Sequence, residues 1–368
     1  MVSLPVHTAG RPQKRDIPLP FCPRAAHRLH TPLFNRNFVP RYLYRLVAPR
    51  SAGNTTSTSV VPPTLEDMLD IFQLPDSAAA SLLLNHLLWQ RGHETRCNLM
   101  SWTSSLMFAL QYALYRHQKD GDDLRNIYLI VLDTSLFPEG TFIQNMELMY
   151  CFEHADRGLR KFIQFRETEY YFGEYLTQGQ LDIQGRCACT SVQKMIELGL
   201  FELQPGLADK QQWRWWPKRV LDFRQLFLSS FTVPTTDGDI ETAVDIAREC
   251  LGEQWIVAGA LMLLALQPRC EDELDLIQGF STRFTGMFEW PMIFTYLLNY
   301  TVADIRRARL DRMTIDPKRL PEVRQFKELV ETIQRSYVLP EDTSLVESVE
   351  DLGFNTGLSD TPPNRGDL

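Results

Sequence analysis

Strand-forming patterns are confined to the first 190 residues of this 368-residue chain, and the remainder shows only helical patterns. Runs with strand character occur at 41–47, 98–103, 127–132, 170–176, 180–183 and 187–190. From about residue 219, apolar residues recur every three or four positions, which is the spacing of helices that bury one face. This separation of strands from helices predicts an α+β fold.

A strand–helix–strand unit in the first half has the clearest local signals. Residues 98–103 are predicted to form a strand, and Ser104 or Ser105 is a good N-cap for a helix that runs to about Lys119. Residues 127–132 (Ile-Tyr-Leu-Ile-Val-Leu) are a continuous apolar run, which is typical of a strand covered on both faces. We therefore expect a mixed β-sheet with flanking helices.

The second half is predicted to be a separate helical domain. Helical stretches are expected at 239–251, with Asp239 as the cap, and at 254–266, 271–279, 289–300, 301–313 and 321–337. We place an α+β domain at residues 41–212 and an all-α domain at residues 213–338. The segment 213–219 at this boundary mixes aromatic and basic side chains. We expect that segment to anchor the two domains together, with stacking on nucleobases as the alternative.

The two ends of the chain carry opposite charge. Residues 1–40 hold six Lys or Arg against one acid and are rich in proline, whereas residues 339–368 hold seven acids against one Arg. These compositions predict a disordered basic arm and a disordered acidic tail. Because the formal net charge is -8, nucleic acid is not expected to be the main partner of the whole chain, and only the basic arm remains a candidate.

Composition also bears on the environment of the protein. The apolar run 255–266 has twelve residues, short of the roughly 18–20 that a membrane helix needs. The N-terminus has no apolar signal core. Seven cysteines are scattered without a paired C-x-x-C motif, so neither a zinc site nor a disulfide framework is expected. We predict an intracellular protein, cytoplasmic or nuclear, with no metal and no membrane partner.

Three residues that can carry chemistry occur in order on successive predicted strands, namely Arg45, Ser101 and Glu174. Arg45 lies in a Tyr-Arg strand that leads into a loop of small and polar residues. Ser101 opens the segment Ser-Trp-Thr-Ser-Ser ahead of a helix, and Glu174 lies in Tyr-Tyr-Phe-Gly-Glu-Tyr-Leu, five residues before Gly179. In this order and context, residues 40–200 resemble the Arg-Ser-Glu class of ADP-ribosyltransferases, the cholera-toxin-like branch.

The resemblance implies a transferase-like protein that binds NAD and cleaves its nicotinamide–ribose bond, with transfer to an unknown acceptor or with hydrolysis. It assigns to Glu174 the stabilisation of the oxocarbenium-like ribose, to Arg45 a phosphate contact, and to Ser101 the orientation of both groups. Aromatic side chains near Glu174 are expected to stack on nicotinamide, Phe172 among them. The expected NAD-binding residues are Tyr44, Arg45, Ser101, Thr103, Tyr171 and Tyr175.

Two positions depart from that class. Arginine-modifying members carry a second Glu two residues before the catalytic one, whereas this chain has Phe172 there, so arginine as the acceptor is in doubt. Trp102 stands where a small residue is usual. Plain structural roles also remain open, with Arg45 as a strand residue paired with an acid and Ser105 as a helix cap. The alternative function is therefore a catalytically inactive interaction or scaffold protein that uses the same fold to bind an unknown protein partner.

The chain is also similar to an uncharacterised fungal protein family of unknown function. The similarity lies in the Ser-Trp-Thr-Ser-Ser and Tyr-Tyr-Phe-Gly-Glu-Tyr-Leu segments. This similarity identifies a related family but implies no activity. Elsewhere, His86 and His93 are seven residues apart without an acid-rich neighbourhood, so we expect them on a helix surface and not in a site.

Overall fold

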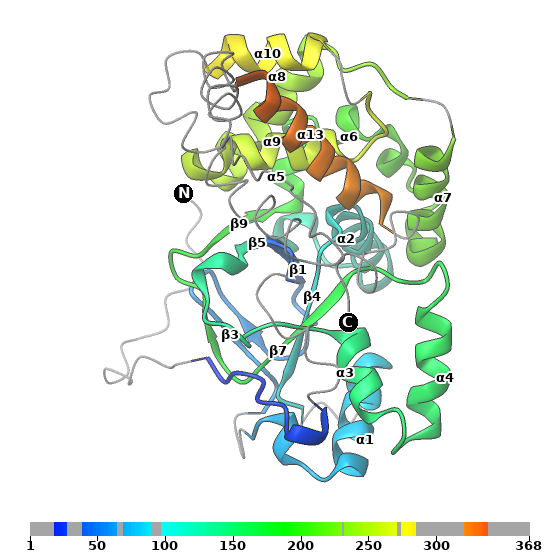
Figure 1. Ribbon diagram of the computed structural model, residues 1–368. Coiled ribbons are helices and arrows are strands. Elements are labelled where there is room, and N and C mark those ends of the chain that lie inside the picture. Colours follow the sequence, from blue (N-terminus) through cyan, green and yellow to red (C-terminus); the bar gives the residue numbers. More distant parts are fainter. Residues whose placement is uncertain are drawn as a thin grey trace, which may run out of the picture.

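The computed structural model describes residues 18–27, 39–64, 69–89, 97–229, 232–270, 274–284 and 320–337. These residues form an α+β protein in which two β-sheets are flanked by helices, as the sequence predicts (Figure 1). Most of the predicted basic arm, both helices expected between 289 and 313, the acidic tail and His93 lie outside the described residues.

The larger sheet has six strands in the order β6-β7-β4-β1-β5-β9, and the smaller sheet has three in the order β2-β3-β8. The bounds are β1 Tyr42–Val47, β2 Asn54–Thr55, β3 Ser59–Val61, β4 Leu99–Thr103, β5 Tyr128–Asp133, β6 Ile143–Gln144, β7 Glu174–Gln178, β8 Leu181–Asp182 and β9 Cys187–Ser191. The named strands pair antiparallel throughout the described residues. The expectation of a mixed sheet is therefore wrong. Apolar pattern locates a strand but carries no information on its direction.

Helices lie beside the strands in the first half and dominate the second. The bounds are α1 Asp76–Leu87, α2 Leu106–Asp120, α3 Asn145–Phe152, α4 Arg157–Arg166, α5 Val192–Glu197, α6 Leu200–Leu203, α7 Trp216–Leu228, α8 Asp237–Ile246, α9 Ile256–Leu264, α10 Leu274–Phe284 and α13 Pro321–Tyr337. The sequence interpretation did not include α3, α4 or α7. Two of these, α3 and α4, precede Glu174 in the chain and help to build the site described below.

Local chemistry explains where several elements begin and end. The side chain of Ser105 accepts the Phe108 N–H at 3.1 Å and so starts α2, as predicted. Asp239 is not the cap of α8; Thr236 is, and Asp239, the third residue of the helix, returns the hydrogen bond to complete a capping box. The strand expected from residue 170 begins only at Glu174, because Gly173 has a φ of 66° that interrupts extended backbone.

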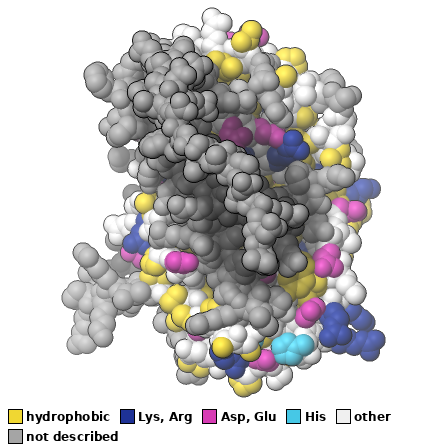
Figure 2. Space-filling view, in the orientation of Figure 1, with side chains coloured by type: hydrophobic (Ala, Val, Ile, Leu, Met, Phe, Trp, Pro, Cys, Tyr) yellow, Lys and Arg dark blue, Asp and Glu magenta, His cyan; other side chains and the backbone are white. Residues whose placement is uncertain are grey.

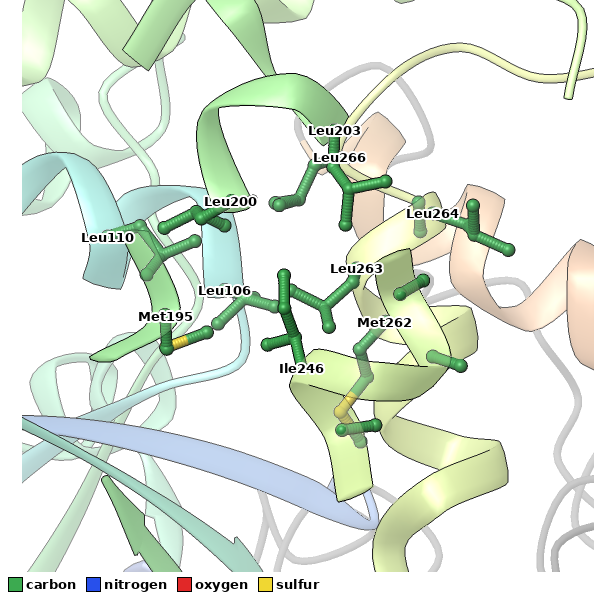
Figure 3. Packing of buried hydrophobic residues seen from close by; sticks show 14 of the residues in the cluster. Leu106, Leu110, Met195, Leu200, Leu203, Ile246, Met262, Leu263, Leu264 and Leu266 are labelled. Atoms are coloured by element: carbon green, nitrogen blue, oxygen red, sulfur yellow. The ribbon is translucent and has the colours of Figure 1, made fainter. Parts of the chain in front are cut away.

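One hydrophobic core runs from the large sheet into the helical half. It contains Tyr42 and Tyr44 of β1, the buried face of α2, and apolar side chains of α5 to α9 and α13. Figure 3 shows Leu106 and Leu110 of α2 close to Leu200 of α6 and Leu263 of α9. The boundary expected between residues 212 and 213 therefore does not separate two cores.

The opposite face of the large sheet is covered by the small sheet. Val60 of β3 and Leu181 of β8 pack there with Leu43, Trp102 and Tyr175 of the large sheet. A further cluster joins α1, α3 and α4 to the β7 edge. Residues 18–27, although part of the predicted flexible arm, pack at this edge, where Leu19 forms a bridge with Gln178.

The most apolar helix is a core element. All nine residues of α9 are buried. In the described ranges, no helix is both long and apolar enough to cross a membrane. The apolar run 255–266 therefore has its place in the protein core.

Helix α4 is amphipathic and exposes a basic face. Arg157, Arg160 and Lys161 are exposed, and Figure 2 shows Lys and Arg side chains gathered over the lower end of this helix. Leu159 and Ile163 are buried against α1 and α3 on the other side. This packing directs the last turn of α4 towards the start of β7, where Arg166 meets Glu174.

Candidate functional site

A cavity of about 830 Å³ lies where β1, β4 and β7 meet α1, α2 and the start of α7. Its charged lining consists of Arg45, Arg50, Arg116, Lys119 and Arg166 against Asp120 and Glu174. Five cationic and two anionic side chains give a formal balance of +3, in a protein whose net charge is -8. The cavity is therefore suited to an anionic ligand.

The three residues singled out from the sequence line this one cavity. Ser101 Oγ donates to Glu174 Oε1 at 2.8 Å, and Arg45 Nη1 donates to the carbonyl oxygen of Ser101 at 2.7 Å. Ser101 lies opposite Leu176 on β7, two positions from Glu174, so the two polar side chains are diagonal neighbours on one sheet face. Ser101 thus connects the other two residues.

Arg45 approaches the cavity from a different direction. Strand alternation puts Arg45 on the face of Leu43 and Trp102, opposite to the face of Ser101. However, the register of β1 with β4 includes only Tyr44 opposite Thr103, and the Arg45 guanidinium lies beside β4, 5.9 Å from the Trp102 ring. Arg45 therefore lines the cavity from between the two strands. Burial lowers its pKa to about 10, and its Nε has no hydrogen-bond partner among the described residues.

Glu174 is held by two further side chains from helices that the sequence interpretation missed. Asn145 Nδ2 at the start of α3 donates to Glu174 Oε2 at 2.8 Å, and Arg166 Nη2 in the last turn of α4 lies 3.5 Å from the same oxygen. Asn145 Oδ1 and Arg166 Nε are buried without a hydrogen-bond partner in the described part of the chain. Such unsatisfied polar atoms beside a carboxylate are typical of a site that binds a polar ligand.

The segment before Glu174 is positioned by a close backbone approach. The Ser104 N–H donates to the Gly173 carbonyl at 2.8 Å, and a Cβ on Gly173 would lie 2.1 Å from Ser104 Oγ. Thr103 Oγ1 donates to the Phe172 carbonyl at 2.6 Å. Only glycine fits at position 173, because both the positive φ and the contact exclude a side chain.

His86 is part of the site, and the expectation that it lies on a helix surface is wrong. His86 Nε2 is 2.8 Å from Ser101 Oγ, and its Nδ1 is 3.1 Å from Cys97 Sγ. Burial, with a smaller effect from Arg45, lowers the pKa of His86 to about 4, so the imidazole is neutral at pH 7. Its position in the last turn of α1 gave no signal in the sequence, because only the fold brings α1 beside β4.

The predicted NAD-binding residues divide into two groups. Tyr44 and Thr103 line the cavity, as does Phe172. Tyr171 and Tyr175 do not: Tyr175 is buried between the sheets with Trp102, and Tyr171 packs near α3, where its hydroxyl accepts a hydrogen bond from Gln144. Tyr175 follows Glu174 directly in a strand and so faces the opposite side.

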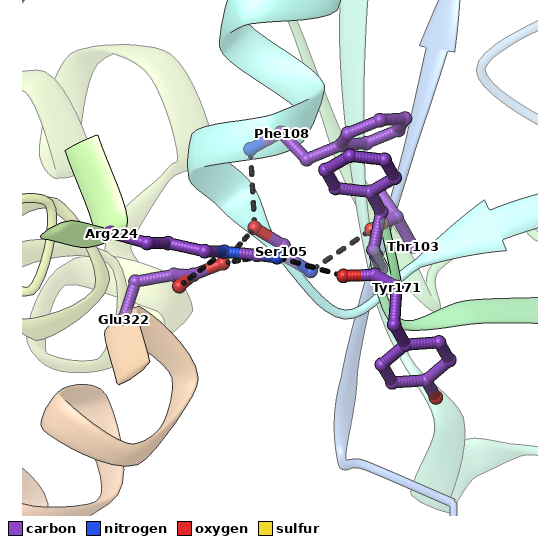
Figure 4. A network of polar contacts seen from close by, with 7 residues as sticks. Thr103, Ser105, Phe108, Tyr171, Arg224 and Glu322 are labelled. Carbon is purple, nitrogen blue, oxygen red and sulfur yellow. Dashed lines mark hydrogen bonds and ion pairs between the residues drawn. The ribbon is translucent and has the colours of Figure 1, made fainter. Parts of the chain in front are cut away.

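A buried polar network ties the helical half to this site (Figure 4). Arg224 of α7 pairs with Glu322 of α13 at 2.8 Å and donates to the Tyr171 carbonyl at 2.7 Å. Ser105 Oγ donates to Glu322 at 2.5 Å while it caps α2. The side chains of Arg224 and Glu322 are each only 4% exposed, so the pair is shielded from water. Helices α7 and α13 thus hold the start of α2, which follows β4, and the segment that precedes β7.

Fold and site together describe an antiparallel α+β protein with a cationic cavity around Arg45, Ser101 and Glu174. Residues 38–184 match a family model described as a domain of unknown function (DUF7587), which agrees with the likeness to an uncharacterised family. The match contains these three residues and leaves out α7 and α13. No curated protein and no solved structure matches the chain. Among the described residues, no group of three or more His, Cys, Asp or Glu is arranged to hold a metal ion.

Proposed function

We propose that the protein is ADP-ribosyltransferase-like and that it binds NAD in this cavity and cleaves the nicotinamide–ribose bond. The observation that supports it most is the Ser101–Glu174 hydrogen bond of 2.8 Å within a cationic cavity that Arg45 also lines. NAD carries a diphosphate, which suits the formal balance of +3 in the lining.

In the proposed reaction, the bond between ribose C1′ and the nicotinamide nitrogen breaks, and its electron pair leaves with nicotinamide. Positive charge then develops on the ribose, and the Glu174 carboxylate stabilises it electrostatically. Glu174 Oε1 accepts from Ser101 and retains a lone pair for a ribose hydroxyl. Arg45, whose Nε lacks a partner in the described residues, pairs with phosphate.

The second reactant is either water or an acceptor whose nucleophilic atom attacks C1′ and releases a proton. Phe172 lies two residues before Glu174, and its ring stacks on Phe108 at 4.7 Å. It is also within 5.9 Å of the Arg166 guanidinium. An apolar ring among cations disfavours a guanidinium acceptor, so we propose hydrolysis or a non-arginine acceptor.

A catalytically inactive interaction protein is the second candidate. Both Glu174 oxygens already accept from side chains of the chain, namely Ser101 on one and Asn145 on the other. In this view the carboxylate is a structural centre that joins β4, β7 and α3, and the cavity binds a ligand without chemistry.

Nicotinamide release from NAD by the purified full chain distinguishes the two candidates. We expect Glu174→Gln to lower the rate by about 10²–10³-fold, since it removes the charge that stabilises the ribose cation. Glu169→Gln is the matched control, because Glu169 is exposed and does not line the cavity. Equal rates in the wild type and Glu174→Gln would exclude Glu174 as the catalytic group. No release with retained NAD binding would favour the inactive candidate.

A further inference from the structure

An aromatic wall lines the cavity along α2. Trp216 at the start of α7 is its centre, with ring centroids 5.2 Å from Tyr112, 5.7 Å from Tyr115 and 5.9 Å from Trp89. Phe108, which stacks on Phe172 near Glu174, is seven residues before Tyr115 on α2. Seven helical residues span about 10 Å, so Tyr115 lies well along α2 from Phe108. Trp216 contacts both, with its ring centroid 5.3 Å from Phe108 and 6.2 Å from Phe172, so the wall continues from the Glu174 end of the cavity.

Trp89 is held at this wall in an unfavourable conformation. It follows α1 with a φ of 51°, in the left-handed region where glycine or asparagine is usual, and its side chain is 54% exposed. Such a conformation costs an ordinary residue free energy, yet Trp89 gains little burial from it. Its ring is nearly parallel to Trp216, with 22° between the planes. A strained, exposed aromatic residue at a cavity is typical of ligand contact and not of packing.

Cationic side chains border the same wall. Arg116 and Lys119 follow on α2, and Lys119 Nζ lies 5.2 Å from the Tyr115 ring. Asp120 is the only carboxylate among the described lining residues at this end, and it pairs with Arg116 and approaches Arg50 at 4.0 Å. Three cations against one carboxylate leave a formal +2, which favours an anionic ligand and disfavours a cationic one.

We infer that the wall of Trp89, Tyr112, Tyr115 and Trp216 is a nucleotide subsite, in which a nucleobase stacks on the rings and its phosphate meets Arg116 and Lys119. Stacking and cationic contacts are how proteins bind bases without reading their edges. The inference rests on the proposed function for the identity of the nucleotide, since the base is either the adenine half of NAD or a separate nucleotide acceptor. Both sources share the same chemistry.

Binding of AMP to the full chain, measured by calorimetry and by tryptophan fluorescence, tests the subsite without any need for catalysis. We expect Trp89→Gly to weaken AMP binding about tenfold or more while thermal stability is unchanged or higher, since glycine tolerates a positive φ. Lys119→Gln should weaken AMP binding and leave adenosine binding unchanged. Trp215→Ala is the matched control, because Trp215 is 50% exposed next to Trp216 and does not line the cavity.

Titration of AMP in the presence of saturating NAD separates the two sources. Competition assigns the subsite to the adenine half of NAD, and binding on top of NAD assigns it to a second nucleotide; either outcome supports the inference. Absence of AMP binding, or equal affinity in the wild type and Trp89→Gly, overturns it. Absence of nicotinamide release with retained AMP binding would instead exclude only the proposed cleavage reaction.

Discussion

The surroundings of Ser101 show how strongly single side chains depend on one another in this site. Its hydroxyl donates to the Glu174 carboxylate, with 2.8 Å between the two oxygens, so His86 Nε2, 2.8 Å from Ser101 Oγ, is the donor to the hydroxyl oxygen. The other ring nitrogen, Nδ1, lies 3.1 Å from Cys97 Sγ, and the lowered pKa of His86 keeps the ring neutral at pH 7. A second proton on the imidazole would place another positive charge near Arg45 in a partly buried site.

His86 makes the stability of the protein depend on pH. Its pKa is about 4 in the folded protein and about 6.5 when unfolded, so the unfolded state binds more protons between these values. Stability should therefore fall as pH decreases from about 6.5 to 4. We expect the free energy of unfolding to fall about 1–3 kcal/mol more in the wild type than in His86→Gln between pH 7 and 4.5.

Urea unfolding of both proteins at the two pH values measures this difference. The comparison isolates His86, because other groups contribute to both proteins, including Glu147, whose pKa burial raises to about 7. An identical pH dependence in the two proteins would contradict a neutral, half-buried His86.

Helices α7, α13 and α2 are joined by polar contacts that are shielded from water. The pair of Arg224 and Glu322 links α7 to α13, and Ser105 adds the N-terminus of α2. Removal of one buried charge leaves the other unpaired, which is worse than removal of both. The contact between these helices therefore depends on the pair being complete.

Glu322→Ala should lower the free energy of unfolding by about 3–5 kcal/mol. The double variant Arg224→Met/Glu322→Met should lose less, because no charge remains buried without a partner. Denaturant unfolding of the two variants, with Arg324→Ala as an exposed control on α13, measures both values. If the double variant loses more than Glu322→Ala, the charge pair is not the origin of the effect.

At the scale of the whole molecule, the continuous core makes the two halves interdependent. Tyr44 of β1, Leu110 of α2 and Leu263 of α9 belong to one cluster of buried residues. Separation of the halves would expose apolar surface on both, which favours aggregation over independent folding.

We expect a fragment of residues 1–212 not to fold by itself, although it contains the whole match to the family model. Circular dichroism, dye binding and amide NMR dispersion of the fragment test this expectation, and the full chain should unfold in one cooperative transition. A cooperative unfolding transition of the fragment with dispersed amide signals would show that the helical half is dispensable for the fold.

Local patterns in the sequence were sufficient for most of the strands and for the start of α2. Residues 127–132 became β5 because a continuous apolar run suits a strand covered on both faces, and Ser105 caps α2 by a contact three residues away. Such signals depend on neighbours in the chain. Helix α3 was missed because its residues are almost all buried, so it lacks an amphipathic pattern.

The sequence by itself determined the α+β class and the order of Arg45, Ser101 and Glu174 along three strands. Only the tertiary structure decided strand direction and the placement of His86, Asn145 and Arg166 around Ser101 and Glu174. It also decided that the two predicted domains share one core. The physical reason is that periodicity and capping act over a few residues, whereas strand pairing, burial and charge pairing join residues that are far apart in the chain.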